Sequence, residues 1–170
     1  MTQVDATTTT EALVQTPITG RETLTDLTDP AQALAEFYRA FNSRDLALIA
    51  KNWALSAMVS MDNPLGGIKR GWPEIRAVYE QIFAGPGRVE VAFFDYTLHQ
   101  VGELLYAVGR ERGRLEANGQ ALDLATRTSR VFQMIEGRWR QVHHHGSIED
   151  AGLLGAYQSA VRPGGEGAAS

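Results

Sequence analysis

The segment from Thr128 to Ser147 constrains the fold more than any other part of the chain. Glu136-Gly137 is a common hairpin pair, so residues 128–147 are predicted to form two strands joined by a turn at 135–138. Because side chains alternate along a strand, one face of the first strand carries Leu122, Leu124, Thr126, Thr128, Arg130, Phe132 and Met134. Arg130 is therefore predicted on a largely apolar face. A buried guanidinium needs a partner, which must be an internal carboxylate or a ligand.

Bulk composition excludes several classes of function. The 170 residues predict one domain with a substantial core, and the net charge of −4 without a basic run argues against nucleic acid and anionic membranes as partners. With no cysteine, the chain lacks disulfides, thiol nucleophiles and thiolate metal sites, which fits a cytoplasmic location. We expect no signal peptide and no membrane span, since no apolar run approaches about 18 residues.

The first half of the chain reads as an arm followed by helices. Residues 1–28 are rich in threonine with little periodicity, which predicts a disordered or loosely attached arm. Asp29-Pro30 is a typical helix start and opens the predicted domain at 29–149. Apolar spacing predicts helices at 30–42, 45–55 and 73–83. A short strand is expected at 57–61, followed by a turn over 62–67.

The second half of the chain is predicted to be β-structure. Strands are expected at 88–101, 104–116, 120–135 and 138–149, before a tail at 150–170 with a short helix near 152–161. Helices grouped against one face of an antiparallel sheet define the α+β class. A strongly curved sheet with helices on its concave side forms a cone, and its open mouth is where a small ligand is expected.

Three segments resemble a known superfamily. FYRAFNSRDLALIAKNW (37–53), MDNPLGGIKRGWPEIRAVYEQIF (61–83) and SRVFQMIEGRWRQVHHHGS (129–147) are similar to the NTF2-like superfamily. The nearest branches are SnoaL-like proteins and the association domain of calcium/calmodulin-dependent kinase II. The resemblance covers residues 30–149 and implies a cone of curved antiparallel sheet closed by three helices. It also implies homodimers or larger assemblies through the outer face of the sheet.

The superfamily contains ketosteroid isomerases, dehydratases, epoxide hydrolases, polyketide cyclases and association modules without chemistry, so the fold does not fix the function. In the comparison with the isomerases, Tyr38 matches a tyrosine that donates to the oxyanion. Asn63 falls where those enzymes carry the catalytic aspartate, with Asp62 one residue earlier, and Arg130 replaces their second acid. An amide cannot accept the proton, so steroid isomerisation by that mechanism is not expected.

The comparison with the kinase association domain points to two arginines. Arg110 and Arg130 match two pocket arginines, and we expect them on adjacent strands of one apolar face, Arg110 following Leu104, Tyr106 and Val108. They are either structural ion-pair partners, with Asp62 or Glu111 near, or a cationic floor for a carboxylate or phosphate. Guanidinium binds such anions through two parallel hydrogen bonds.

Several other residues are candidates for the site. Alternation puts His143 and His145 on one face, which we expect to pack outward with Trp139 at a subunit contact. His144 shares the other face with Arg140 and Val142, which the resemblance to the isomerases places toward the cavity, as a titratable group or a satisfied core histidine. Asp62 is either a turn cap or a displaced base. The aromatic residues Trp53, Tyr79 and Phe83 belong to the core or to the wall of a ligand cavity.

Two hypotheses follow. In the first, the protein binds a small, partly apolar, anionic molecule and acts on it as a lyase, isomerase or dehydratase. Tyr38, Asp62 and His144 are then the catalytic candidates, and the ligand-binding set is Arg110, Arg130, Trp53, Asn63, Tyr79 and Phe83. No metal or cofactor is expected. In the second, the chain is a homo-oligomeric association module whose pocket is vestigial or regulatory.

Overall fold

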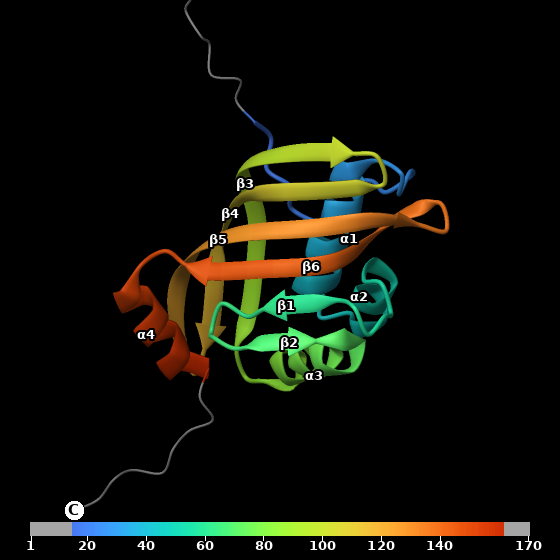
Figure 1. Cartoon of the computed structure of the whole chain (residues 1–170). Helices are drawn as coiled ribbons and strands as arrows, with labels where there is room; N and C mark the ends of the chain where they lie inside the picture. The colour runs from blue at the N-terminus through green and yellow to red at the C-terminus, as the bar shows by residue number, and fades with distance from the viewer. Residues whose placement is uncertain (1–14, 162–170) are drawn as a thin grey trace, which may run out of the picture.

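A computed structural model describes residues 15–161, which form four helices and six strands (Figure 1). In chain order these are α1 Pro30–Asn42, α2 Leu46–Asn52, β1 Ser60–Asp62, β2 Ile68–Arg70, α3 Gly71–Ala84, β3 Arg88–Val101, β4 Leu104–Ala117, β5 Gln120–Ile135, β6 Arg138–Ile148 and α4 Ala151–Val161. The predicted helices and the four long strands lie within a few residues of these bounds. The α+β prediction is confirmed.

Aspartate caps explain where the first two helices begin. The Asp29 carboxylate accepts a hydrogen bond from the Ala31 amide at 2.9 Å, and Pro30 occupies the first helical turn. The Asp45 carboxylate accepts from the Leu48 amide at 2.9 Å. Each cap satisfies an amide that the helix leaves without an internal partner.

The sheet has the order β2-β1-β6-β5-β4-β3. Neighbouring strands are antiparallel except for β1 and β6, which run parallel, so the sheet is mixed rather than entirely antiparallel as predicted. Strand β2 was not predicted. Like β1 it has only three residues, too few for an alternating pattern to be recognised in the sequence.

Two features of β3 and β4 bend the sheet. A bulge shifts the register between Phe94 and Thr97, so that Asp95 and Tyr96 lie opposite Gly109. Further along β4, a Cβ atom at Gly113 would lie 1.9 Å from the Glu90 carbonyl oxygen. The two strands thus approach more closely at Gly113 than any other residue allows. Figure 1 shows α1 behind the long strands and α3 beside β1 and β2, while the near face of the long strands is uncovered.

A second bulge changes the alternation along β6. Val131 pairs with His143 but Phe132 pairs with Gln141, which leaves Val142 as an extra residue. Trp139 and Gln141 are therefore buried on the inner face, and so is His144, three residues after Gln141. The prediction that Trp139 lies outward with His143 and His145 is wrong, because the bulge reverses the phase of the strand between them.

Residues 15–28 differ from the loosely attached arm that was predicted, and residues 1–14 lie outside the described part. Ile18 is buried and exchanges two backbone hydrogen bonds with Phe93, at 3.0 and 2.8 Å. The Gln15 side chain bonds both backbone groups of Tyr96, and the Asn42 side chain bonds both backbone groups of Val91. The segment before α1 is held by one buried apolar side chain, Ile18, and by hydrogen bonds to the backbone of β3. Such contacts produce no periodic pattern in the sequence.

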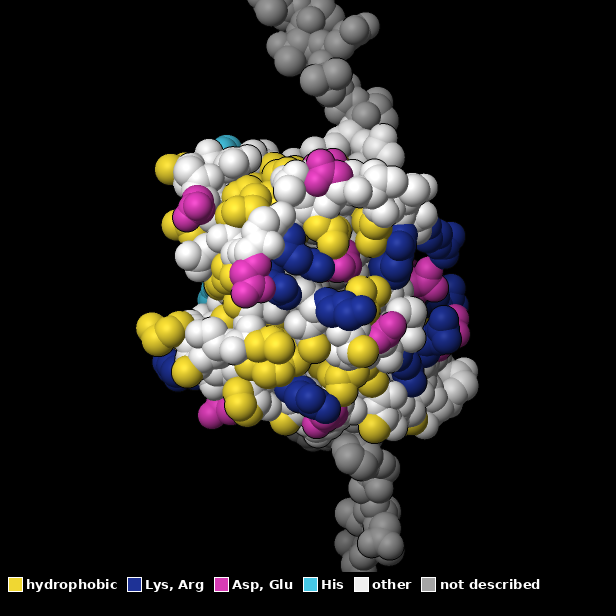
Figure 2. Space-filling view, turned by 90° about the vertical axis from the view of Figure 1, so that its right-hand side faces the viewer, with side chains coloured by type: hydrophobic (Ala, Val, Ile, Leu, Met, Phe, Trp, Pro, Cys, Tyr) yellow, Lys and Arg dark blue, Asp and Glu magenta, His cyan; other side chains and the backbone are white. Residues whose placement is uncertain are grey.

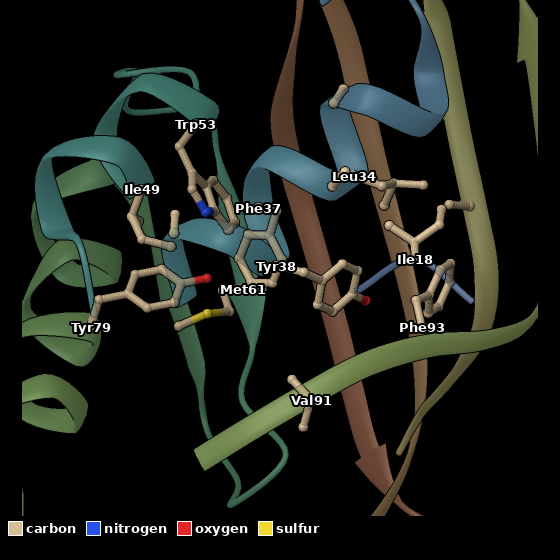
Figure 3. Packing of buried hydrophobic residues seen from close by; sticks show 14 of the residues in the cluster. Ile18, Leu34, Phe37, Tyr38, Ile49, Trp53, Met61, Tyr79, Val91 and Phe93 are labelled. Atoms are coloured by element: carbon tan, nitrogen blue, oxygen red, sulfur yellow. The ribbon is translucent and has the colours of Figure 1, made fainter. Parts of the chain in front are cut away.

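One hydrophobic core fills the space between the helices and the concave face of the sheet. Figure 3 shows Trp53 after α2, Tyr79 on α3 and Phe37 on α1 around Met61, with Tyr38 directed toward Phe93. The Tyr38 and Phe93 rings stack with centroids 5.8 Å apart. The core thus ends in a set of aromatic side chains that also border the candidate site.

The close approach at Gly113 predicts a large effect of adding a methyl group. Gly113→Ala should destabilise the domain by about 2–3 kcal/mol, because the new Cβ meets backbone that cannot rotate away. Urea unfolding measures the change. The matched control is Gly155→Ala on α4, where a Cβ meets open space and a helix gains stability. Equal midpoints for the two variants would contradict the prediction.

Candidate functional site

A buried ion pair lies on the concave face of the sheet. The Arg130 side chain on β5 is 1% exposed, and it donates to the Glu111 carboxylate on β4 at 2.6 Å. It also donates to the Gln141 side-chain oxygen on β6 at 2.8 Å, and its guanidinium carbon lies 3.6 Å from the centroid of the Phe37 ring. Burial acts to lower the pKa of Arg130, but Tyr38 and Glu111 more than offset this, so its pKa is raised and it remains charged. The internal-carboxylate alternative for Arg130 is therefore the arrangement observed.

Tyr38 completes this network from α1. Its hydroxyl donates to the same Glu111 oxygen at 3.0 Å. Burial, then the negative charge of Glu111, raises the pKa of Tyr38 well above its usual value, so the phenol keeps its proton. The hydroxyl thus orients Glu111.

His144 stands close to this network on β6. It is 6% exposed, and neither of its ring nitrogens finds a hydrogen-bond partner within residues 15–161. Burial, then the charge of Arg130, then His143 and His145, lower the pKa of His144 well below its usual value. At neutral pH the ring is uncharged, with one nitrogen able to donate and the other able to accept.

A cavity of about 80 Å³ opens beside these groups. Its wall is largely apolar, with Phe37, Phe41, Met61, Val78, Ile82 and Val91. The polar residues on the wall are Asn63, Tyr79, Glu111, Thr126, Arg130, His144 and Tyr157. The cavity is thus apolar on most sides with polar groups from β4, β5 and β6 on the sheet side.

Two predicted ligand-binding residues lie on this wall in different roles. The Tyr79 hydroxyl and the Trp53 indole N–H are both buried without a hydrogen-bond partner among the described residues. Burial raises the pKa of Tyr79 to about 12, so it can donate but does not ionise near neutral pH. The Asn63 side chain accepts from the Leu65 amide at 2.9 Å and shapes the turn before β2.

Arg110 does not join Arg130, because it lies on the opposite face of the sheet. It forms ion pairs with Asp95 and, at 2.8 Å, with Glu149. The buried residues of β4 are Leu105, Ala107, Glu111, Leu115 and Ala117, so the inner face has the other phase of the alternation. The expected pocket with two arginines is therefore corrected to one with a single arginine, Arg130, paired with Glu111.

Asp62 is also placed outside the cavity. Its carboxylate lies 2.9 Å from Nδ1 of His145 on the outer face of the β1–β6 pair. Met61, the residue before it, points inward and is buried. Asp62 therefore does not face a ligand held beside His144, and the role of a displaced base is not supported by this position.

The other two aromatic candidates pack near the cavity without lining it. Trp53 is fully buried and meets Tyr79 edge to face, with ring centroids 6.5 Å apart. Phe83 contacts Phe41 and Tyr79, with both centroid distances at 6.0 Å. Trp53 and Phe83 therefore pack against Tyr79, which lines the cavity, without lining it themselves.

Glu111 and Tyr157 are two of the site residues that sequence reasoning missed. Glu111 was considered only as a neighbour of the arginines, although its strand position matches that of Leu105, Ala107 and Leu115. Tyr157 reaches the cavity from α4, and the short tail helix carries no sequence signal for that contact. Arg110, Arg112 and Arg114 mark one face of β4 as the outer face. Assigning the faces from these arginines would have placed Glu111 on the inner face.

The described residues hold no group of three or more His, Cys, Asp or Glu side chains arranged for a metal ion. Within the same residues, no helix is both long and apolar enough to cross a membrane. On the face shown in Figure 2, lysine and arginine side chains are interspersed with acidic and apolar ones.

The SnoaL-like domain family matches residues 31–151, most of the chain. The chain belongs to the SnoaL-like family. This match confirms the resemblance suggested by the three sequence segments. Comparison with curated proteins gives no match.

Solved structures similar to this SnoaL-like domain share its fold at low identity. A candidate dehydratase of the NTF2-like family from Streptomyces avermitilis has a TM-score of 0.65 and 19% identity, covering 70% of this chain and 93% of its own. An NTF2-like superfamily protein from Salmonella enterica has a TM-score of 0.64 and 22% identity, with 70% and 87% covered. A candidate calcium/calmodulin-dependent protein kinase type II association domain from Thiobacillus denitrificans has a TM-score of 0.61 and 23% identity, with 74% and 99% covered. At these identities the likeness establishes the fold.

Removing one member of the ion pair should be costly. Arg130→Met leaves Glu111 buried without its cation, and we expect a loss of about 3–5 kcal/mol in the free energy of unfolding. Adding Glu111→Gln should recover part of that loss, since the double variant no longer buries an unpaired charge. Arg127→Met, an exposed change on the same strand, should have little effect. Additive losses in the double variant would argue against the pair.

The buried neutral His144 predicts a pH dependence with a defined sign. The pKa of His144 is lowered in the folded state, whereas in the unfolded chain it is about 6.5. Below that pH the unfolded state binds a proton that the native state does not, so stability falls as pH falls, by at most about 1.4 kcal/mol per unit.

Urea unfolding of wild type and His144→Leu between pH 7.5 and 5 measures this slope. We expect a shallower slope in His144→Leu than in wild type. Parallel curves for wild type and His144→Leu would show that His144 titrates normally.

Proposed function

We propose that this protein binds a small, partly apolar molecule whose oxygen-bearing group contacts His144 and Arg130. We further propose that it acts on this molecule by acid–base chemistry of the lyase, isomerase or dehydratase type. The observation that carries the proposal is His144, buried on the cavity wall with both ring nitrogens unpartnered in the described part of the chain. Buried polar atoms nearly always have a partner, so this arrangement suits a ligand that supplies one.

The charges of Arg130 and Glu111 on the cavity wall favour some oxygen-bearing ligand groups over others. Arg130 is paired with Glu111, so the two charges largely cancel at the cavity. A carboxylate or a neutral carbonyl can accept from Arg130, the phenol of Tyr79 and the donating nitrogen of His144. A phosphate dianion would bring two charges close to Glu111, so the carboxylate is preferred between the two anions considered.

The same groups support a proton-transfer mechanism. The neutral His144 ring takes a proton from the carbon next to the ligand carbonyl, and the electron pair moves onto the carbonyl oxygen. Arg130 and the Tyr79 hydroxyl, whose pKa is raised to about 12, stabilise that oxyanion by donating hydrogen bonds. In a dehydration, the oxyanion re-forms the carbonyl, a carbon–carbon double bond forms, and the hydroxyl on the next carbon leaves as water with the proton that His144 returns. Tyr38 holds Glu111 in place.

A thermal-shift screen tests binding. Acetate, butanoate, butanone and inorganic phosphate are compared on wild type, His144→Leu and Arg127→Met. A probe at 100 times its dissociation constant stabilises by about 2.7 kcal/mol, or roughly 5–10 °C for a domain of this size. We expect butanoate to raise the melting temperature of wild type and Arg127→Met, and to lose most of that shift in His144→Leu. Phosphate as the sole active probe, or a butanoate shift unchanged in His144→Leu, would overturn the proposal.

A second function is favoured by the outer face of the sheet. Four large apolar side chains on β3 and β4 are exposed there: Val101 71%, Leu104 50%, Tyr106 44% and Val108 44%. Exposed apolar patches of this kind mark protein contacts. We propose that this face forms a homodimer, and that assembly is the protein's function if the cavity binds no ligand. One similar structure is itself a candidate association domain.

Analytical ultracentrifugation tests the dimer. We expect wild type to sediment as a dimer and Val108→Arg to sediment as a monomer, because a charge is placed in the apolar contact. Met58→Arg is the control, since Met58 is 89% exposed and lies outside the sheet. A monomeric wild type would remove this alternative.

A further inference from the structure

The cavity beside His144 continues into a larger groove. That groove has a volume of about 450 Å³ and runs between α3, α4 and the start of β3. Six residues line both spaces: Asn63, Leu65, Val78, Ile82, Val89 and Tyr157. The two spaces are therefore neighbours rather than independent sites, and the region bounded by these six shared residues is called the neck.

The two spaces differ in size and chemistry. The cavity of about 80 Å³ is well below the roughly 300–1,000 Å³ typical of small-molecule sites, whereas the groove lies within that range. The unpartnered polar atoms of His144 and Tyr79 belong to the cavity. The groove adds small and apolar residues such as Ala77, Pro86 and Leu115, together with the polar side chains of Lys69, Glu74 and Gln81. An oxygen-bearing group meets unpartnered polar atoms in the first space, and a longer chain fits the second along its apolar residues.

Tyr157 on α4 is one of the six residues that form the neck. None of the residues of α4 is fully buried, although Tyr157, Ala160 and Val161 pack against the core. Burial, then the charge of Glu111, raises the pKa of Tyr157 to about 12, so its hydroxyl keeps its proton at neutral pH. Tyr157 has the largest side chain of the six shared residues, so it is the one expected to limit the width of the neck.

We propose that the ligand has two parts, an oxygen-bearing head in the cavity and an extended, unbranched apolar body in the groove, and that Tyr157 selects for this shape. The proposal rests on the head-binding function proposed above. It assigns a substrate class, medium-length straight-chain compounds with a carboxylate or carbonyl head, for which saturated acids serve as unreactive binding probes, and a specificity-determining residue on α4. The groove is filled by the body of the same molecule because the two spaces share their wall.

Isothermal titration with straight-chain acids from acetate to octanoate tests the two-part ligand. In wild type we expect affinity to rise about two- to fourfold for each methylene added beyond butanoate. Ala77→Trp fills the groove from an exposed position on α3, and should weaken octanoate at least about tenfold while leaving acetate unchanged. Ala47→Trp, an exposed alanine on α2 that lines neither space, is the matched control.

The outcomes separate the two proposals. If acetate and butanoate bind in a manner that depends on His144 but affinity does not grow with length, the head site stands and the two-part ligand is wrong. If Ala77→Trp and Ala47→Trp affect octanoate equally, the groove is not the site of the body. If no acid binds, the proposed function itself fails.

A pair of isomers tests the neck. Octanoate and 2-propylpentanoate contain the same atoms, but the second is branched next to its carboxylate. Wild type should prefer octanoate, and Tyr157→Ala should lose most of that preference while still binding acetate. Tyr157→Phe keeps the width of the neck and should keep the preference. An unchanged preference in Tyr157→Ala would overturn the role of Tyr157.

Discussion

The ion pair between Glu111 and Arg130, at 2.6 Å, is the interaction on which the rest of the site depends. Two charges removed from water are stable only when their geometry is good and their remaining atoms are hydrogen-bonded. Tyr38 supplies one such bond from α1 and Gln141 another from β6, so the pair joins a helix to three strands. The pair also sets the character of the cavity, since its charges nearly cancel, and the charge of Arg130 helps to keep His144 neutral.

The sequence was sufficient for the elements whose signals are local. Caps at Asp29 and Asp45 and apolar spacing located the helices, and the alternation of β5 located Arg130 on the buried face. The same rule failed on β4, because both faces of that strand carry apolar side chains. Leu104, Tyr106 and Val108 were taken as the inner set, whereas they are exposed, and Arg110 was misplaced with them. Charge is the better guide here, since Arg110, Arg112 and Arg114 share the outer face.

His144 was predicted to face the cavity, and it does, but the reasoning grouped it with Arg140 and Val142. The bulge at Val142 means that Gln141 and Trp139 lie on the inner face instead. A bulge adds one residue and leaves no trace in a pattern of period two, so the phase of β6 could not be read across it. The contribution of Tyr157 was equally hidden, because it depends on where α4 packs against the rest of the domain.

The segment before α1 has a consequence for assembly. β3 is an outermost strand of the sheet, and such a strand normally offers free amides and carbonyls to another chain. Along Val91, Phe93 and Tyr96 those groups are occupied by Asn42, Ile18 and Gln15. The opposite outermost strand, β2, offers three residues. The sheet is therefore closed to growth by strand addition along this stretch of β3, which leaves its outer face as the surface for the dimer proposed above.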